Sequence, residues 1–261
     1  MPYLWHPWEV KGGAPAFLRF FVKLQLIKTQ TDIFGKALQT YFQNPEKQSL
    51  TTWTNLTDED DVPLAYFFRL YDEMPALEKK ALALASGKTL DVGCGSGSHS
   101  LYLQNQRGLD LTALDISEGA IEVAKARGVK QTQCLSIWDF NEKNFDTILL
   151  LMNGMGIGKT TAELPVLLKH LKALLTPNGS ILVDSSDLIY LFDEEDVALW
   201  KEDDIYYGEV DFGIRFDNQS EEFPWLYIDP KQLEVAAKNA GFNFKIIMEG
   251  ANYDYLAQLS L

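Results

Sequence analysis

From Lys88 onward the chain alternates short, β-rich apolar runs with segments of helical periodicity. Alternation of this kind is typical of a parallel sheet that carries helices on both faces. The expected strands span residues 89–92, 110–114, 131–135, 145–151 and 180–183. The expected helices span residues 98–106, 118–127 and 162–175, the last closed by the turn Pro177-Asn178-Gly179. We therefore predict an α/β fold with a doubly wound sheet.

Both ends of the chain and one internal segment depart from this alternation. Residues 1–74 are expected to form an N-terminal helical cap, with helices around 15–43 and 62–86 joined by the segment TTWTNLTDEDD. Residues 75–261 would form the sheet domain, interrupted after its fifth strand by an insertion at 187–229. A β-hairpin around Asp217-Asn218 is expected in this insertion. A helix from Pro230 to Asn239, ended by Gly241, precedes a final strand pair.

The charge of the chain is strongly negative and unevenly distributed. The 261 residues carry a formal net charge of −14. Nucleic acid is an unlikely partner for such a chain, because binding to phosphates depends on a surplus of Lys and Arg. The insertion 187–229 holds 14 acidic residues against Lys201 and Arg215, a net charge of −12. It is either a solvated acidic face or an element of substrate selection that disfavours anionic molecules and tolerates neutral or cationic ones.

Cysteine content and hydropathy bear on the compartment. Cys94 and Cys134 are too few for a disulfide framework and lack the paired spacing of a metal site, so we expect no metal and a reducing cytoplasm. An apolar stretch at 17–27 is interrupted by Arg19 and Lys23, so no membrane span is expected there. Attachment to a membrane surface through an amphipathic helix is the alternative to core packing for this stretch.

The segment TLDVGCGSGSHS at residues 89–100 is the most informative motif. A strand ending in Asp91 leads into Gly93, Gly95 and Gly97 and then into a helix. Glycines at these positions allow a sharp turn and bring bare backbone against a ligand at the N-terminus of the helix. The dinucleotide fingerprint G-x-G-x-x-G would need glycine where this chain has Ser98.

A second acidic residue follows the next strand. The segment LTALDIS at residues 111–117 contains a second strand that ends in Asp115, twenty residues after Gly95. A carboxylate at this place accepts hydrogen bonds from ribose hydroxyls in nucleotide-binding sheets. The alternative is that Asp115 is the N-cap of the helix that begins at Glu118.

The segments LDVGCGSGSHS, ALDIS and FDTILLLMNG resemble motifs of class I S-adenosylmethionine-dependent methyltransferases, over about residues 75–184. The resemblance implies a seven-stranded, mostly parallel sheet with a reversed last strand, and S-adenosylmethionine as cofactor. Carried over by position, it implies cofactor contacts at Asp91, Gly93, Cys94, Gly95, Gly97, Asp115, Ile116, Ser136, Ile137, Asn153 and Gly154. Such enzymes often place an acidic residue near the adenine, where this chain has Ser136 or Ile137.

Residues outside the motifs are weaker candidates. Arg69 could pair with the cofactor carboxylate as a planar fork or with a surface acid. His99, Tyr66 and Tyr71 are candidates for a general base, which is needed only when the nucleophile starts protonated. Aromatic residues of the cap are either core or the wall of an apolar acceptor site, namely Tyr3, Trp5, Trp8, Phe67 and Phe68.

Three functions remain open from the sequence. The first is methyl transfer to a small molecule or a protein; the second is an NAD(P)-dependent oxidoreductase on a similar sheet; the third is a non-catalytic protein that binds S-adenosylmethionine. A phosphate-binding loop at MNGMGIGKT is disfavoured, because its first glycine would fall at Asn153. The oligomeric state is not indicated.

Overall fold

The computed structural model describes residues 32–46, 49–193 and 206–261. Residues Ile33–Leu261 form one compact unit. The apolar stretch 17–27 and the aromatic residues Tyr3, Trp5 and Trp8 lie outside the described residues. The division of the chain at residues 74 and 75 stays a prediction.

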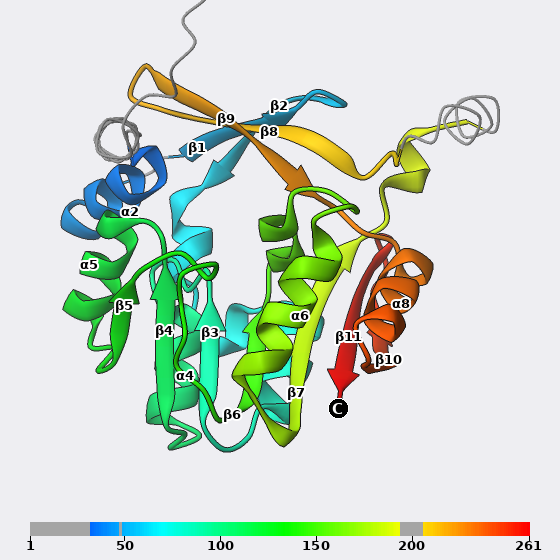
Figure 1. Ribbon diagram of the computed structural model, residues 1–261. Helices are drawn as coiled ribbons and strands as arrows, with labels where there is room; N and C mark the ends of the chain where they lie inside the picture. Colours follow the sequence, from blue (N-terminus) through cyan, green and yellow to red (C-terminus); the bar gives the residue numbers. More distant parts are fainter. Residues whose placement is uncertain (1–31, 47–48, 194–205) are drawn as a thin grey trace, which may run out of the picture. The chain divides into compact units, whose positions relative to one another are not determined.

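A seven-stranded sheet forms the centre of this unit, with the strand order β10-β11-β7-β6-β3-β4-β5 (Figure 1). Its strands are β3 (Thr89–Val92), β4 (Leu111–Asp115), β5 (Thr132–Cys134), β6 (Phe145–Leu150), β7 (Leu175–Ser186), β10 (Asn243–Glu249) and β11 (Asp254–Ser260). Strands β3 to β7 pair in parallel, whereas β11 is antiparallel to both β7 and β10. The predicted mostly parallel sheet with one reversed strand is confirmed.

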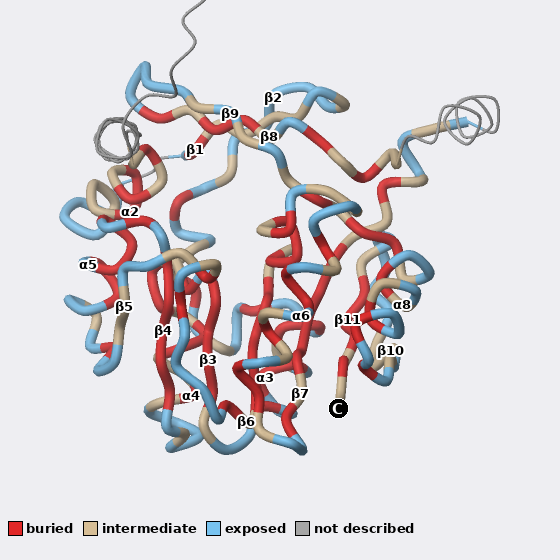
Figure 2. The backbone as a smooth tube through the Cα atoms, viewed as in Figure 1, coloured by how far each residue is buried: buried red, intermediate tan, exposed pale blue. Residues whose placement is uncertain are grey.

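Helices cover both faces of this sheet. The helices are α3 (Ala76–Leu84), α4 (Ser98–Asn105) and α5 (Glu118–Arg127) on one face, and α6 (Leu164–Leu174) and α8 (Pro230–Asn239) on the other. Successive residues of a strand point to opposite faces, so Ile148 and Leu150 of β6 pack with α6, whereas Leu149 packs with the α3 side. Both faces are therefore apolar, and the inner strands β3, β4 and β6 are almost entirely buried, whereas β5 and β10 at the two edges are only partly covered (Figure 2).

The turn expected at Pro177-Asn178-Gly179 lies inside the bounds of β7 instead of before them. Phe145 pairs with Leu175 and Thr147 pairs with Ser180, so the pairing skips the residues between Leu175 and Ser180 on the β7 side. These residues form an irregularity at the start of β7, because α6 ends directly at Leu174 and the strand begins without a separate loop.

A second sheet has four antiparallel strands in the order β2-β1-β8-β9. Strands β8 (Glu209–Phe216) and β9 (Gln219–Leu226) form the expected hairpin, whose turn residues Asp217 and Asn218 both have positive φ angles of 49° and 62°. Strands β1 (Ser49–Thr54) and β2 (Thr57–Pro63) occupy the segment expected to join two cap helices, and that expectation is wrong. The β-branched run SLTTWT pairs with β8, and this pairing decides the local structure.

The rest of the cap region is helical only in part. Helix α2 (Ile33–Gln43) falls within the first expected helix, but the second is broken into the 3₁₀ turns η1 (Leu64–Phe68) and η2 (Tyr71–Glu73), and α3 begins after Pro75. Helix α2 packs closely on α5 at Gly35 and Gly119. A Cβ added at Gly119 would lie 2.7 Å from the Gly35 carbonyl carbon, so the two helices approach each other through glycine.

The four-stranded sheet lies over the carboxyl ends of the parallel strands (Figure 1). It meets the large sheet through η3 (Gly154–Gly158), the 3₁₀ turn that follows β6. The indole of Trp225 on β9 packs flat against Gly156, where a Cβ would lie 1.9 Å from Trp225 Cε2. The small sheet is therefore fastened next to the loops in which ligands of such sheets bind.

We expect Gly156→Ala to lower the free energy of unfolding by about 1–3 kcal/mol, because the added methyl group overlaps the Trp225 ring. Gly158→Ala in the same turn is the matched control, since its Cβ would meet Leu167 Cδ2 at an ordinary 3.4 Å. Urea unfolding of both variants measures the difference. Equal losses in the two variants would contradict the packing argument.

Candidate functional site

The glycine loop follows β3 and leads into α4. Gly93, Gly95 and Gly97 have φ angles of 72°, 53° and 83°, a region that side-chain-bearing residues rarely adopt. Gly97 also has a packing reason, because a Cβ there would lie 2.8 Å from Val129 Cγ2. The backbone therefore needs glycine at all three predicted positions. Cys94, between the first two, is buried, and its burial raises the pKa of its thiol.

Gly93 and Gly95 border nearly open space. Among the described residues other than its chain neighbours, a Cβ at Gly93 would meet only Ile157 Cδ1, at 4.0 Å, and one at Gly95 would meet only the Phe34 ring, at 3.8 Å. Both glycines have positive φ angles, and an added Cβ would not clash at either position. The loop backbone is therefore uncovered on the side that faces α2 and η3. A ligand can approach such a backbone closely.

Asp115 connects the glycine loop to the next loop along the sheet. Its Oδ2 accepts a hydrogen bond from the Gly95 N–H at 2.8 Å, and its Oδ1 accepts one from the Ser117 N–H at 2.9 Å. The N-cap role considered for Asp115 belongs to Ser117, whose Oγ accepts from the Ala120 N–H. Ile116, the next residue after Asp115, is 74% exposed, which is unusual for an isoleucine.

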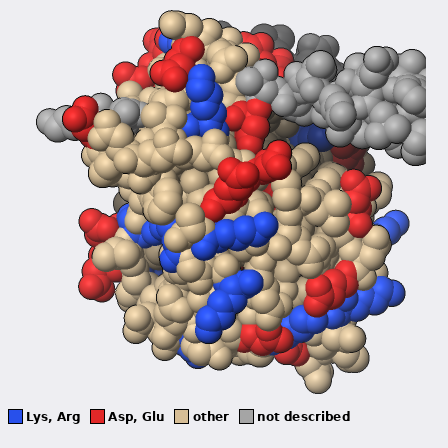
Figure 3. Space-filling view, turned by 90° about the vertical axis from the view of Figure 1, so that its left-hand side faces the viewer, with Lys and Arg blue, Asp and Glu red and all other residues tan. Residues whose placement is uncertain are grey.

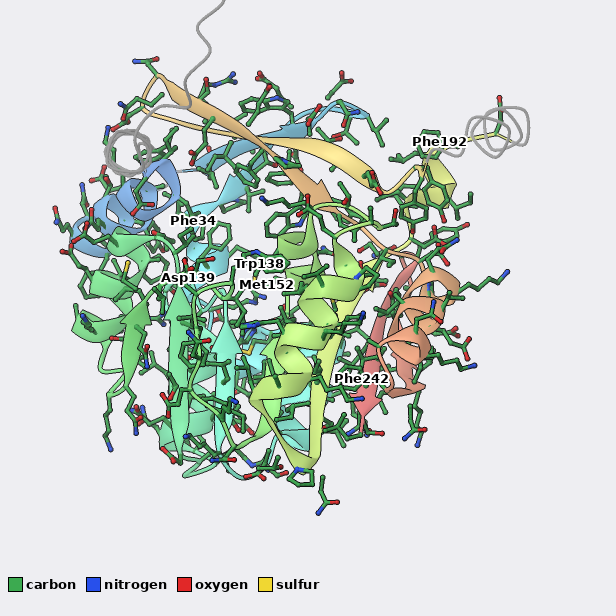
Figure 4. The ribbon with its side chains drawn as sticks, viewed as in Figure 1. Phe34, Trp138, Asp139, Met152, Phe192 and Phe242 are labelled. Atoms are coloured by element: carbon green, nitrogen blue, oxygen red, sulfur yellow. The ribbon has the colours of Figure 1, made fainter. Side chains whose placement is uncertain are left out.

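The loop after β5 brings only some of its predicted residues to the surface. Ile137 is 3% exposed and packs in the core with Leu114 and Phe140. Ser136 is partly buried and its Oγ accepts a hydrogen bond from the Trp138 N–H at 3.3 Å. The side chains of Phe34, Trp138, Asp139 and Met152 lie near one another in the view of Figure 4, at the carboxyl-end edge of the large sheet.

The loop after β6 makes a left-handed turn at Met152 and Asn153, with φ angles of 61° and 57°. Asp184 of β7 holds this turn, because its Oδ1 accepts a hydrogen bond from the Asn153 N–H at 2.7 Å. Asn153 Oδ1 is buried and has no hydrogen-bond partner among the described residues. Gly154, which follows, is buried at the start of η3. Asn153 thus presents an unsatisfied acceptor in a loop beside the glycine loop.

Asp184 was not among the residues singled out from the sequence. Burial raises its pKa to about 6, against the lowering effect of the Asn153 and Met152 N–H groups. A sequence signal existed, because Asp184 follows an apolar strand in the same way as Asp91 and Asp115 do. Carboxyl ends of parallel strands lie at one edge of a sheet, so the three carboxylates are distributed along that edge, on β3, β4 and β7.

A buried ion-pair network lies on the α3 and α4 side of this edge. Glu78 of α3 pairs with the Arg69 guanidinium through Oε1 and with His99 Nε2 through Oε2, the latter at 2.6 Å. Each of these three residues is less than 9% exposed. Asp91 is buried beside them and accepts a hydrogen bond from Ser100 Oγ at 2.5 Å. No pattern in the sequence distinguishes Glu78 from an ordinary acidic residue in the first turn of a helix.

The network shifts the pKa values of its members. Burial opposes the charged form of His99, but the hydrogen bond that His99 donates to Glu78 and the charges of Asp91 and Glu78 outweigh it and raise the pKa. Burial likewise opposes the charge on Glu78, yet His99 and Arg69 lower its pKa. Burial raises the pKa of Asp91. Folding therefore favours a charged His99–Glu78 pair.

Arg69 uses two of its three guanidinium nitrogens in hydrogen bonds. Its guanidinium lies over the Tyr66 ring at 3.7 Å from the centroid and donates to the Tyr66 carbonyl as well as to Glu78. Arg69 Nε is buried and has no partner among the described residues. Arg69 is therefore held in a buried ion pair and is not engaged with a surface acid.

The three candidates for a general base differ in their surroundings. Tyr66 is 40% exposed; burial raises the pKa of its hydroxyl, the Arg69 charge lowers it, and the charges of Glu78 and Asp184 raise it further. Tyr71 stacks on Tyr102 of α4, with ring centroids 4.0 Å apart. His99 is buried in its pair with Glu78. Asp184 interacts electrostatically with both Tyr66 and His99, and of these two side chains Tyr66 is the exposed one.

The chain is similar to known proteins in sequence and in structure. The family model described as a methyltransferase domain matches residues 89–179. The chain is similar to an S-adenosylmethionine-dependent methyltransferase from Bacteroides fragilis, solved in complex with S-adenosyl-L-homocysteine, at 41% sequence identity and a TM-score of 0.79. This similarity covers 87% of the present chain and 94% of the other. The comparison with curated proteins found no match.

More distant structures share the fold. One is an S-adenosylmethionine-dependent methyltransferase from Clostridium acetobutylicum, with 15% identity and a TM-score of 0.50 over 73% of this chain and 93% of that chain. Another is an amino pentose methyltransferase from Micromonospora echinaspora, with 14% identity and a TM-score of 0.50 over 75% of this chain and 94% of that chain.

Two further observations apply to residues 32–46, 49–193 and 206–261. No helix in these ranges combines the length and the apolar character needed to cross a membrane. No group of three or more His, Cys, Asp or Glu side chains in the same ranges could hold a metal ion.

The charged pair makes stability depend on pH. Folding raises the pKa of His99 above its ordinary value of 6.5. The His99–Glu78 pair therefore stabilises the folded protein fully below pH 6.5, and this stabilisation is lost as the pH rises through the pKa of His99 in the folded protein. We expect His99→Gln to cost about 1–3 kcal/mol at about pH 6 and less at about pH 9. Denaturant unfolding at both pH values measures the change in the free energy of unfolding. Glu78→Gln should also make this free energy less dependent on pH. A pH dependence in His99→Gln equal to that of the wild type would contradict this.

Proposed function

Because the chain belongs to the S-adenosylmethionine-dependent methyltransferases, we propose that it binds S-adenosylmethionine over the glycine loop and transfers its methyl group to a small molecule. The single observation that carries this is the loop itself. Gly93 and Gly95 expose left-handed backbone without a packing reason, and Asp115 fixes this backbone through the Gly95 N–H. The relative from Bacteroides fragilis was solved with S-adenosyl-L-homocysteine, the product of such a reaction.

The methionine part of the cofactor would lie along the loop formed by Asp91, Gly93, Cys94, Gly95 and Gly97. The free donor at Arg69 Nε fits a carboxylate, because it is buried and unpaired while the rest of the guanidinium is held by Glu78 and Tyr66. Glu78 would therefore act on the cofactor indirectly, as the residue that positions Arg69.

The adenosine part would lie beyond Asp115. Asp115 would accept hydrogen bonds from the ribose hydroxyls, and the exposed side chain of Ile116 offers an apolar surface to the adenine. Ser136 could contact the adenine through its backbone or hydroxyl group. Ile137 supports the loop from the core and would contact the ring only through its backbone, and the neighbouring Trp138 is the partly exposed alternative.

S-adenosylmethionine supplies a methyl group on a sulfonium, and its transfer to a nucleophile is an in-line displacement with a good leaving group. The protein then has to align the acceptor and exclude water. The turn at Met152 and Asn153, held by Asp184, borders this place together with Gly154. For an acceptor that starts protonated, Tyr66 and Asp184 are the groups positioned to influence the departing proton.

The alternatives are less well supported. A dinucleotide oxidoreductase would need the third fingerprint glycine, and Ser98 stands there with its Oγ hydrogen-bonded to the Phe67 carbonyl. A non-catalytic binder of the cofactor would share the same glycine loop. Nucleic acid is not favoured as acceptor, because basic and acidic side chains are interspersed on the face shown in Figure 3.

We expect Asp115→Ala to weaken binding of S-adenosyl-L-homocysteine by about 1–3 kcal/mol, because the ribose hydroxyls and the Gly95 N–H lose their acceptor. Isothermal titration calorimetry measures this affinity. Asp110→Ala is the matched control: this exposed residue lies just before the opposite end of β4 and should leave the affinity unchanged. Absence of S-adenosyl-L-homocysteine binding to the wild type would overturn the proposal.

A further inference from the structure

Asp184 lies in one row with the glycine loop, across three neighbouring strands of the large sheet. Leu149 of β6 pairs with Asp91 of β3 on one side and with Leu182 of β7 on the other. Two residues further along β3 and β7, this register places Gly93 level with Asp184. Since neighbouring strands are about 4.8 Å apart, the backbones of Gly93 and Asp184 are about 10 Å apart. The Asp184 carboxylate is therefore near the proposed place of the methionine part of the cofactor, on the side away from β4.

Asp184 has a negative charge that no ion pair offsets. The residue is 8% exposed, and within residues 32–46, 49–193 and 206–261 it takes part in no salt bridge. Its Oδ1 accepts from the Asn153 N–H at 2.7 Å, which is an uncharged donor. A buried carboxylate without a cationic partner is costly. A cationic group bound beside the glycine loop would lower this cost.

The ion-pair network on the α3 and α4 side does not supply the missing positive charge. It contains two cations, Arg69 and His99, and two carboxylates, Glu78 and Asp91. Asp184 is attracted to His99 and repelled by Glu78. With Asp184 included, three carboxylates face two cations, so this group of residues keeps one negative charge. S-adenosylmethionine has a positive charge on its sulfur, and a buried charge of opposite sign attracts it more strongly than it would in water.

We propose that Asp184 makes the cofactor site favour the sulfonium of S-adenosylmethionine over the uncharged thioether of S-adenosyl-L-homocysteine. This rests on the function proposed above. When the methyl group is transferred, the electron pair of the broken S–C bond stays on sulfur, which loses its positive charge. The attraction between Asp184 and the sulfur is then lost, and this lowers the affinity for the product relative to the substrate. Asp184 is thus a residue that determines specificity by charge.

The two ligands differ only in the methyl group and the charge on sulfur. Both have the same adenosine, amino and carboxylate groups, so the contacts proposed for Asp115 and Arg69 contribute equally to both affinities. Specificity is a difference between two binding free energies. The dissociation constant of S-adenosyl-L-homocysteine divided by that of S-adenosylmethionine, here called the preference ratio, therefore reports the interaction at the sulfur.

Isothermal titration calorimetry with each ligand measures the preference ratio. We expect Asp184→Asn to lower it about three- to tenfold, because the asparagine oxygen can still accept from the Asn153 N–H but has no charge. Asp146→Asn is the matched control and should leave the ratio unchanged. Asp146 lies near the start of β6, at the opposite edge of the sheet, and also accepts from a backbone N–H, that of Lys88 at 2.9 Å.

The preference ratio of the unmodified protein should also depend on pH. Burial raises the pKa of Asp184 to about 6, so its carboxylate is charged above this pH and becomes neutral as the pH falls through it. We expect the ratio to fall about three- to tenfold between about pH 8 and about pH 5. Asp184→Asn should remove most of this pH dependence.

The titratable groups around Asp184 respond differently to pH. Glu78 of α3 has a lowered pKa and stays charged over this range, and Tyr66 of η1 and Tyr255 of β11 have raised pKa values and stay neutral. His99 of α4 gains a positive charge as the pH falls. Its share of the pH dependence remains in Asp184→Asn, which is why the variant and the unmodified protein are compared over the same pH range.

An unchanged preference ratio in Asp184→Asn would overturn the inference, and so would equal weakening of both ligands, which is the result for a residue that only holds the loop after β6. A ratio that is independent of pH in the unmodified protein would overturn it without any variant. Failure of the unmodified protein to bind either ligand would instead overturn the proposed function. Normal binding of both ligands with a ratio that ignores Asp184 removes only this inference.

Discussion

The site depends on carboxylates that end parallel strands and bind the backbone of neighbouring loops. Asp115 accepts from the Gly95 N–H, and Asp184 accepts from the Asn153 N–H. A buried carboxylate is costly unless its oxygens are satisfied, so each of these acids needs its loop in one conformation. In turn, each loop has left-handed residues that hold their geometry only because the surroundings fix it. The glycine loop and the loop after β6 are thereby each held in one conformation by a carboxylate of the sheet.

The network of Arg69, Glu78 and His99 extends this principle to the segments that cover the sheet. One carboxylate joins the end of η1 to α3 and α4, and burial of all three groups makes loss of any one expensive. Because Arg69 also stacks on Tyr66, the ion pair fixes the side chains that reach from the cap toward the sheet edge. The small sheet packs on the loop after β6 through Trp225. The cap and the insertion, which are far apart in sequence, therefore cover the same edge of the large sheet.

The central sheet was predictable in detail. Strand β3 and helices α5 and α8 have the expected bounds, because their glycine, serine and proline signals lie at the ends of strongly apolar segments. The hairpin at 49–63 was not predictable, because β1 pairs not only with the adjacent β2 but also with β8, more than 150 residues later in the chain. The acidic run of β2 looks like a loop until it is seen as an exposed edge strand, where charged residues are tolerated.

The sequence by itself determined the fold class, the glycine loop and Asp115, because periodicity and positive φ requirements are local properties that the residues carry with them. It could not determine the roles of Glu78 and Asp184, or that Phe212, Phe223 and Trp225 lie on one side of the β8–β9 hairpin. The meaning of those residues comes from burial and from neighbours distant in sequence: a helix acid becomes half of two ion pairs, and alternate residues of a hairpin become one surface. Only the tertiary structure decided which side chains share the edge above the loop, since strand pairing between separate segments sets that arrangement.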